Sequence, residues 1–67
     1  MNFVEILKEI MEDKNLNQTE FALKIGLKQS QISEWLKGKS LPGYSSLKAI
    51  CQNIDVSADY LLGLKDY

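Results

Sequence analysis

Lysine is the side chain whose placement in this sequence is most uneven. Residues 24–48 contain five lysines and one glutamate, a net charge of +4, whereas the whole chain has a net charge of -1. A lysine ammonium is a point charge that suits phosphate groups. The uneven placement is consistent with one positively charged face on an otherwise acidic molecule, or with solvated lysines spread over a small surface. Charge alone leaves both interpretations open.

The missing residue types exclude several kinds of chemistry. The chain has no histidine and one cysteine, Cys51, so it has no internal disulfide, no Cys/His zinc site and no catalytic imidazole. It also lacks arginine and shows no convincing pair of a nucleophile and a base. We therefore expect no enzyme activity, no metal, no cofactor and no small-molecule substrate. Cys51 is expected to be an inert thiol in the core.

Length and composition indicate one small globular domain that covers residues 1–67. The chain is 45% hydrophobic and 25% charged, and its one proline and four glycines favour helices over a many-stranded barrel. It contains no run of eighteen apolar residues and no basic start followed by an apolar stretch. We therefore expect no membrane span, no secretory signal and a cytoplasmic location.

Apolar residues recur at three- and four-residue steps and predict five helices. Asn17 and Glu20 have the spacing of a capping box at the start of the second helix, and Ser57 can cap the last helix. The sequence predicts a compact all-α fold, since no segment alternates convincingly over the length of a strand. The predicted helices cover residues 2–14, a short segment ended by Gly26, about residues 28–37, a segment capped by Ser45 or Ser46, and residues 58–62.

The second and third helices flank Gly26. Two helices joined by a short turn that contains glycine are typical of the helix-turn-helix, whose second helix lies in the major groove of DNA. Ile32, Trp35 and Leu36 define the inward face of the third helix, and this spacing favours a core role for Trp35 over base stacking. The pattern alone is weak evidence, because any helical hairpin can contain a glycine.

The order of short motifs carries a family resemblance. Residues 16–63, LNQTEFALKIGLKQSQISEWLKGKSLPGYSSLKAICQNIDVSADYLLG, closely resemble the Cro and lambda-type repressor helix-turn-helix family. The matching motifs are L-N-Q, A-x-x-x-G across the turn, I-S-x-W, K-G-K-x-x-P and V-S-x-D-Y-L-L-G, and the first helix also matches. The resemblance implies a five-helix, lambda-repressor-like DNA-binding domain and a sequence-specific transcriptional regulator, with repression expected.

The resemblance also implies which side chains read bases. Gln29 and Ser30 match the principal base-reading positions of the family, with Ser33 and Glu34 one turn further along. Glutamine can pair with adenine, serine with either purine, and glutamate with the amino group of cytosine. A solvated role remains an alternative, above all for Glu34, whose carboxylate is repelled by phosphate unless it reads a cytosine or pairs with lysine.

A second set of residues is expected to contact the DNA backbone. Gln18 matches the glutamine that hydrogen-bonds a phosphate in the family and buttresses the third helix. Asn17 has the alternative role of a plain N-cap, and Tyr44 that of packing on the fourth helix. Lys24 and Lys48 are weaker candidates. The full set of predicted phosphate-binding residues is Asn17, Gln18, Lys28, Lys37, Lys39, Ser40 and Tyr44.

The end of the chain carries more apolar groups than one short helix can bury. Related proteins use this end to join subunits, so Tyr60, Leu61 and Leu64 are expected to form the contact of a homodimer on a pseudo-palindromic double-stranded operator. A protein-interaction module on the same fold, such as an antitoxin or anti-repressor, is the alternative. The sequence pI of about 5.2 supports that alternative. The positive charge of residues 24–48 favours DNA.

Overall fold

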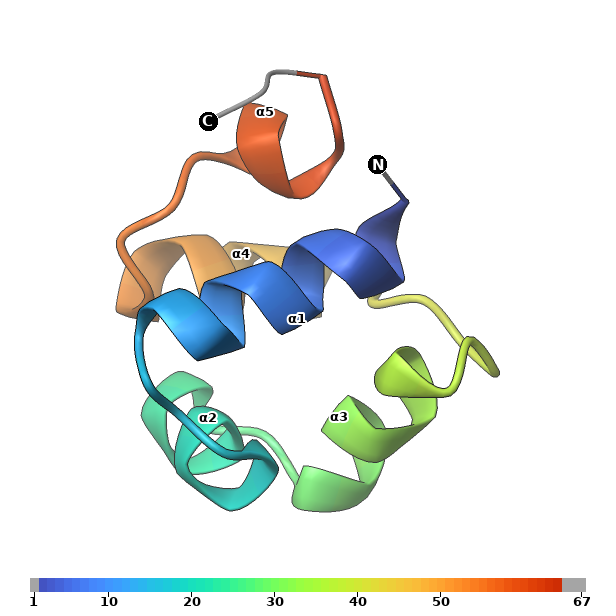
Figure 1. Ribbon diagram of the computed structural model, residues 1–67, viewed down its shortest axis with the longest axis vertical. Helices are drawn as coiled ribbons and strands as arrows, with labels where there is room; N and C mark the ends of the chain where they lie inside the picture. Colours follow the sequence, from blue (N-terminus) through green and yellow to red (C-terminus); the bar gives the residue numbers. More distant parts are fainter. Residues whose placement is uncertain (1, 65–67) are drawn as a thin grey trace.

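The computed structural model describes residues 2–64, which form five helices and no strand (Figure 1). The all-α class predicted from periodicity is confirmed, and none of these helices is long and apolar enough to cross a membrane. The helices are α1 (Phe3–Asp13), α2 (Gln18–Ile25), α3 (Gln29–Leu36), α4 (Tyr44–Asn53) and α5 (Ala58–Leu61).

Three helices begin at a side-chain cap. The side-chain oxygens of Asn2, Asn17 and Ser57 each accept a hydrogen bond from the backbone amide three residues later, at 2.9, 2.8 and 3.1 Å. These bonds satisfy amides that have no partner within the helix. Three predicted helices are slightly too long, because Asn2 caps α1, Lys28 and Lys37 flank α3, and Leu62 is the C-cap of α5.

The prediction that Ser45 or Ser46 caps the fourth helix is wrong. Helix α4 begins at Tyr44, its N-cap position is Gly43 in an extended conformation, and no side chain caps it. Glycine is accepted at an N-cap, so the helix starts directly after the Pro42–Gly43 pair and takes both serines into its first turn.

The helices separate into two ends of the molecule. In Figure 1, α2 and α3 lie at the bottom, α5 lies at the top, and α1 and α4 lie between them. Helix α2 packs against α3 and α4, whereas α5 packs against α1 and α4. The α2–α3 pair therefore forms one end of the domain and is held there by contacts with α1 and α4.

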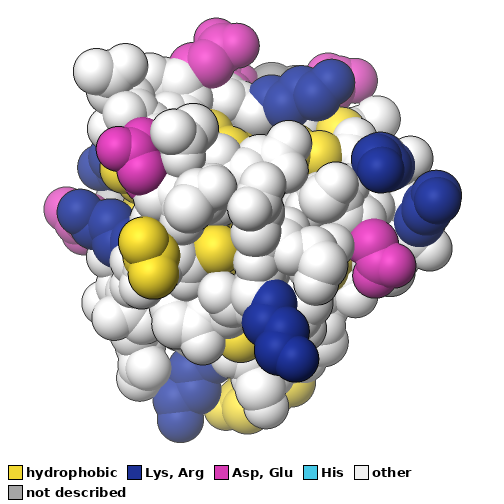
Figure 2. Space-filling view, turned by 90° about the horizontal axis from the view of Figure 1, so that it is seen from below, with side chains coloured by type: hydrophobic (Ala, Val, Ile, Leu, Met, Phe, Trp, Pro, Cys, Tyr) yellow, Lys and Arg dark blue, Asp and Glu magenta, His cyan; other side chains and the backbone are white. Residues whose placement is uncertain are grey.

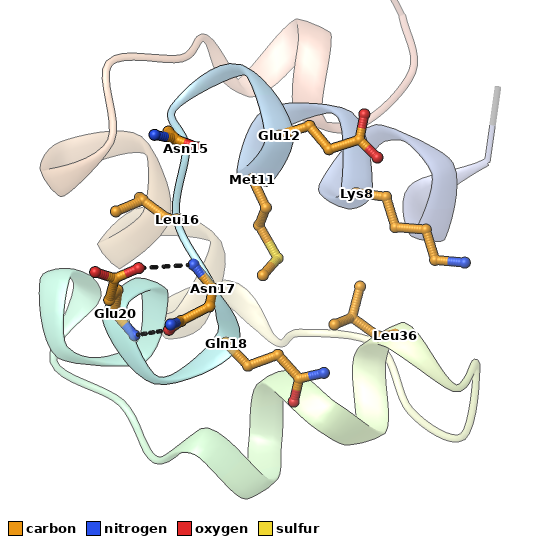
Figure 3. A pocket seen from close by; sticks show the side chains of 9 residues that line it. All are labelled: Lys8, Met11, Glu12, Asn15, Leu16, Asn17, Gln18, Glu20 and Leu36. Atoms are coloured by element: carbon orange, nitrogen blue, oxygen red, sulfur yellow. Dashed lines mark hydrogen bonds between the residues drawn. The ribbon is translucent and has the colours of Figure 1, made fainter.

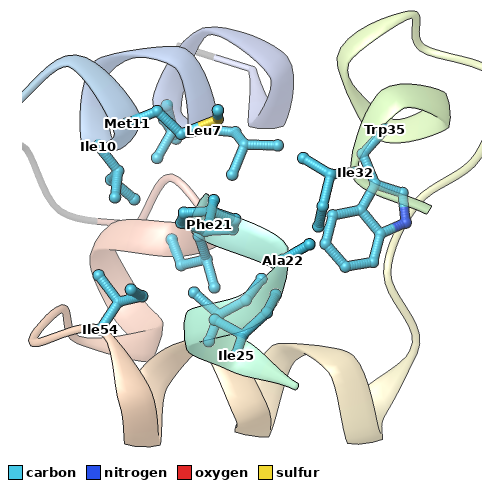
Figure 4. Close-up of a cluster of buried hydrophobic side chains, with 12 residues drawn as sticks. Leu7, Ile10, Met11, Phe21, Ala22, Ile25, Ile32, Trp35 and Ile54 are labelled. Carbon is cyan, nitrogen blue, oxygen red and sulfur yellow. The ribbon is translucent and has the colours of Figure 1, made fainter. Parts of the chain in front are cut away.

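All five helices contribute to one apolar core, part of which is shown in Figure 4. Trp35 is only 3% exposed, and its ring meets Phe3 edge-on with 6.2 Å between ring centroids, so the predicted core role of Trp35 is confirmed. Cys51 packs against the core but is half-buried. The buried residues are Ile6, Leu7, Ile10, Met11, Phe21, Ala22, Ile25, Ile32, Trp35, Ile50, Ile54 and Leu61.

The prediction that Leu61 contacts a second subunit is wrong. Leu61 is 1% exposed and belongs to the core of its own chain. Helix α5 has only four residues, yet it packs against α1 and α4 and contributes the Leu61 side chain to the core. Leu64 is 72% exposed and Leu62 is 56% exposed, whereas Tyr60 is half-buried. The apolar groups of this end thus divide between the core and the surface.

Replacement of Leu61 by alanine is expected to lower the free energy of unfolding by about 2–4 kcal/mol, because it removes buried methyl groups and leaves a cavity. Urea denaturation followed by circular dichroism measures this difference. The control is Leu62→Ala, which truncates an exposed neighbour and should stay within about 0.5 kcal/mol of the parent. A larger loss for Leu62→Ala than for Leu61→Ala would contradict the packing described here.

Tyr60 lies beside the acidic face of α1. Desolvation raises the pKa of its phenol above the ordinary value of 10.0, and the negative charges of Glu9 and Asp13 raise it further. Glu9, Asp13 and Tyr60 line a common groove together with Asp55. A phenolate at this position would add a negative charge to an acidic surface, so the folded state favours the neutral phenol.

The stability of the domain should therefore fall at alkaline pH. Because the folded pKa of Tyr60 is raised, its contribution is fully present below pH 10.0 and is lost as the pH rises through the folded value. Tyr60→Phe should show a smaller loss of stability between about pH 9 and 11 than the parent. Urea midpoints across this range test the difference. Tyr44→Phe, which removes an exposed phenol on α4, is the matched control.

Candidate nucleic-acid interface

A tight turn at Gly26 sets the direction of α3 relative to α2. Gly26 has a φ of 75°, and a Cβ atom there would meet nothing within 4 Å, so the turn needs glycine for its backbone conformation and not for space. The amide of Leu27 donates to the carbonyl of Ala22 at 3.0 Å. Leu27 then packs against the core, which fixes the path of the chain into α3.

Helix α3 has an apolar inward face and a polar outward face. Ile32 and Trp35 are buried, while Leu36 is half-buried against the core, so the predicted inward face is confirmed. The four residues predicted to read bases occupy positions i, i+1, i+4 and i+5 and share the outward face. Gln29, Ser30 and Glu34 are exposed, and Ser33 is half-buried.

One of these side chains is held by a residue that sequence reasoning missed. The hydroxyl of Thr19 in the first turn of α2 donates to Oε1 of Gln29 in the first turn of α3, at 3.1 Å. The resemblance placed this buttressing role on Gln18. The Gln18 side chain does extend from the start of α2 toward α3 (Figure 3), but the hydrogen bond to Gln29 comes from Thr19.

A capping box fixes the first turn of α2. The amide of Glu20 donates to Oδ1 of Asn17 at 2.8 Å, and the amide of Asn17 donates to Oε1 of Glu20 at 3.0 Å (Figure 3). The predicted N-cap role of Asn17 is confirmed. Its side-chain oxygen therefore accepts from the amide of Glu20. The amides of Gln18 and Thr19 come before this capped amide in the first turn of α2.

A shallow groove lies between α1, the start of α2 and the end of α3 (Figure 3). Met11, Leu16 and Leu36 provide its apolar part, and polar groups such as Lys8 and Gln18 surround them. Gln18, which lines this groove, is the first residue of α2. In residues 2–64, no group of three or more metal-ligating side chains is arranged to hold a metal ion.

Lysines stand at both ends of α3. Lys28 occupies the N-cap position, where its backbone amide donates to Oε1 of Gln31 at 3.3 Å while its side chain is exposed. Lys37 is the C-cap, and Lys39 follows Gly38, whose φ is also 75°. Lys37, Lys39 and Ser40 are all exposed. Cationic and polar groups therefore flank the outward face of the helix at its two ends.

Figure 2 shows the molecule from the side of α2 and α3. The middle of this view is largely uncharged, with some hydrophobic side chains visible among the white groups, and lysines are distributed around it with several carboxylates between. All five lysines of residues 24–48 are exposed. The face is thus not uniformly positive, and its lysines surround a neutral centre.

The position of Tyr44 removes one of its two predicted roles. Tyr44 is the first residue of α4 and is 78% exposed, so its ring does not pack on the fourth helix. Its phenol remains a candidate phosphate ligand, at the end of the loop that follows Lys39 and Ser40.

The arrangement is that of a known family. A model of that family, described as helix-turn-helix, matches residues 7–61. The chain belongs to the helix-turn-helix family. This match confirms the resemblance to Cro and lambda-type repressors, whose members are DNA-binding regulators of transcription and not enzymes. Within the matched range, α2, the turn at Gly26 and α3 are the helix-turn-helix itself.

Two curated relatives carry regulator names. The chain is 37% identical over 62 residues to the HTH-type transcriptional activator BcrR of Enterococcus faecalis. The aligned segment covers 92% of this chain and 30% of the relative. The chain is also 37% identical over 60 residues to the uncharacterized HTH-type transcriptional regulator YqaE of Bacillus subtilis, with 90% and 52% covered. The chain thus spans about a third to a half of these relatives. No solved structure matches it significantly.

Proposed function

We propose that this chain is the DNA-binding part of a sequence-specific transcription regulator and that α3 enters the major groove. The outward face of α3 carries the proposal, because Gln29, Ser30 and Glu34 are exposed there while Ile32 and Trp35 anchor the opposite face. An eight-residue helix is about 12 Å long, which is comparable to the width of the major groove of about 12 Å.

The side chains of this face favour particular bases. Gln29 has a carboxamide that can accept from N6 and donate to N7 of adenine, and the hydroxyl of Ser30 can donate or accept. The carboxylate of Glu34 can only accept, so within a groove it suits the amino group of cytosine. Since the chain has no arginine, the operator should be read without the bidentate arginine–guanine contact.

The flanking residues would hold the DNA backbone. Lys28 at one end of α3, and Lys37 and Lys39 at the other, are exposed and carry the charge that phosphate needs. Ser40 and Tyr44 extend this set along the loop after α3, and the start of α2 adds the side chain of Gln18 and backbone amides. Asn17 supports this contact by capping α2.

Two copies would bind a pseudo-palindromic operator. A two-fold dimer places two α3 helices in successive major grooves about 34 Å apart. With Leu61 buried in its own core, the exposed Leu64 and the half-buried Tyr60 remain candidates for the dimer contact. We propose repression as the outcome, because a protein on an operator excludes others from the same DNA. The relative BcrR is named an activator.

Selection of bound duplexes from a random DNA pool tests base reading. We expect the parent to enrich a palindromic site, and Gln29→Ala to relax the preference at one symmetric position by about 1–3 kcal/mol, because one bidentate base contact is lost. Glu12→Ala, which alters an exposed residue of α1, is the matched control and should enrich the parent site. A uniform pool that Gln29→Ala does not alter would contradict base reading and direct attention to a protein partner.

Salt dependence tests the lysine contacts. Each neutralised phosphate contributes about -0.9 to the slope of log K against log salt concentration, so Lys39→Gln should make the slope shallower by about that amount. The loss should be similar for cognate and unrelated duplexes, because a phosphate contact carries no base information. Lys14→Gln, at the end of α1, should leave the slope unchanged, and an equal effect of both variants would speak against a specific contact.

A further inference from the structure

A hydrogen bond between Thr19 and Gln29 joins the side chains of α2 and α3, and it reaches a proposed base-reading residue. Thr19 lies in the first turn of α2 and Gln29 is the first residue of α3, ten positions later. The donor–acceptor distance is 3.1 Å, just longer than the roughly 2.5–3.0 Å usual for a hydroxyl donor and an oxygen acceptor. Both side chains are exposed, so they lie at the surface that would face DNA.

The position of Thr19 at the start of α2 makes its hydroxyl available for a hydrogen bond outside its own helix. A threonine in a helix interior commonly donates to the carbonyl three or four residues before it. Thr19 is the second residue of α2, so those carbonyls belong to the segment before the helix, and the hydroxyl donates across to α3 instead. The hydrogen bond shows that the first turns of α2 and α3 lie next to each other.

The contact determines what the Gln29 amide can offer a base. The amide oxygen has two lone pairs, of which Thr19 uses one, and the amide nitrogen keeps both of its N–H donors. One acceptor site and a donor thus remain side by side, which is the pair that N6 and N7 of adenine require. The bond also restricts the rotamers of a long side chain before DNA arrives, which reduces the entropy lost on binding.

We propose that Thr19 is a positioning residue that sets the base preference of Gln29 without touching the base itself. This inference rests on the proposed function, because it requires Gln29 to read a base. A purely structural role would be small, since both groups are exposed and water replaces the lost hydrogen bond when the domain is free.

Three variants test the inference. Thr19→Val keeps the shape of the side chain and removes the hydroxyl, Thr19→Ser keeps the hydroxyl, and Gln29→Ala removes the reading group. The measured quantity is the ratio of dissociation constants for two duplexes that differ only at the base pair assigned to Gln29 by the selection above. Binding to an unrelated duplex, the salt slope and the thermal midpoint are measured in parallel.

For Thr19→Val, we expect this ratio to fall by a factor of about five, with Thr19→Ser close to the parent. Binding to the unrelated duplex, the salt slope and the thermal midpoint should not change. In a Gln29→Ala background, Thr19→Val should have no further effect on the ratio, because the two residues act through one contact.

The possible failures are distinguishable. If Gln29→Ala lowers the ratio and Thr19→Val does not, the positioning role is overturned while base reading by Gln29 stands. If Thr19→Val weakens binding to all duplexes equally, or acts as strongly without Gln29, Thr19 has a backbone or structural role and the inference is again overturned. If Gln29→Ala itself leaves the ratio unchanged, base reading by this residue and the inference fail together.

Discussion

The burial of Ile32 and Trp35 on one side of α3 is the constraint on which the rest of this structure depends. A helix of eight residues has little stability of its own, so contacts with other elements must hold it in place. Once these two side chains are buried, the rotation of α3 about its axis is fixed, and Gln29, Ser30 and Glu34 must face outward. The turn at Gly26 and the packing of α2 then set the direction in which this face points.

Much of this arrangement follows from local patterns. The steps between apolar residues predicted five helices, and the spacing of Asn17 and Glu20 predicted a capping box that the structure contains. Periodicity also identified the inward face of α3, and hence its complement. These features depend on residues within one or two turns of each other, so a sequence reports them directly.

The wrong cap of α4 is a local error, whereas the error at Leu61 arose where distant parts of the chain meet. The pattern shows that Leu61 needs burial, but it does not show whether the covering surface belongs to the same chain or to another. The bond from Thr19 to Gln29 depends on the angle between two helices, which no spacing reveals, so the sequence did not point to Thr19. The roles of the lysines in DNA binding remain predictions, since exposure is all that the structure adds for them.

The division of α3 into two faces has an evolutionary consequence. Substitutions on its outward face leave the core intact, so under the proposed function the domain could acquire a new target sequence without a new fold. Residue 29 is an exception to this freedom, because its side chain shares a hydrogen bond with residue 19 on another helix. If residue 29 reads a base as proposed, a change of specificity at this position is a change of two residues, and the route from one target to another passes through intermediates in which only one partner has been replaced.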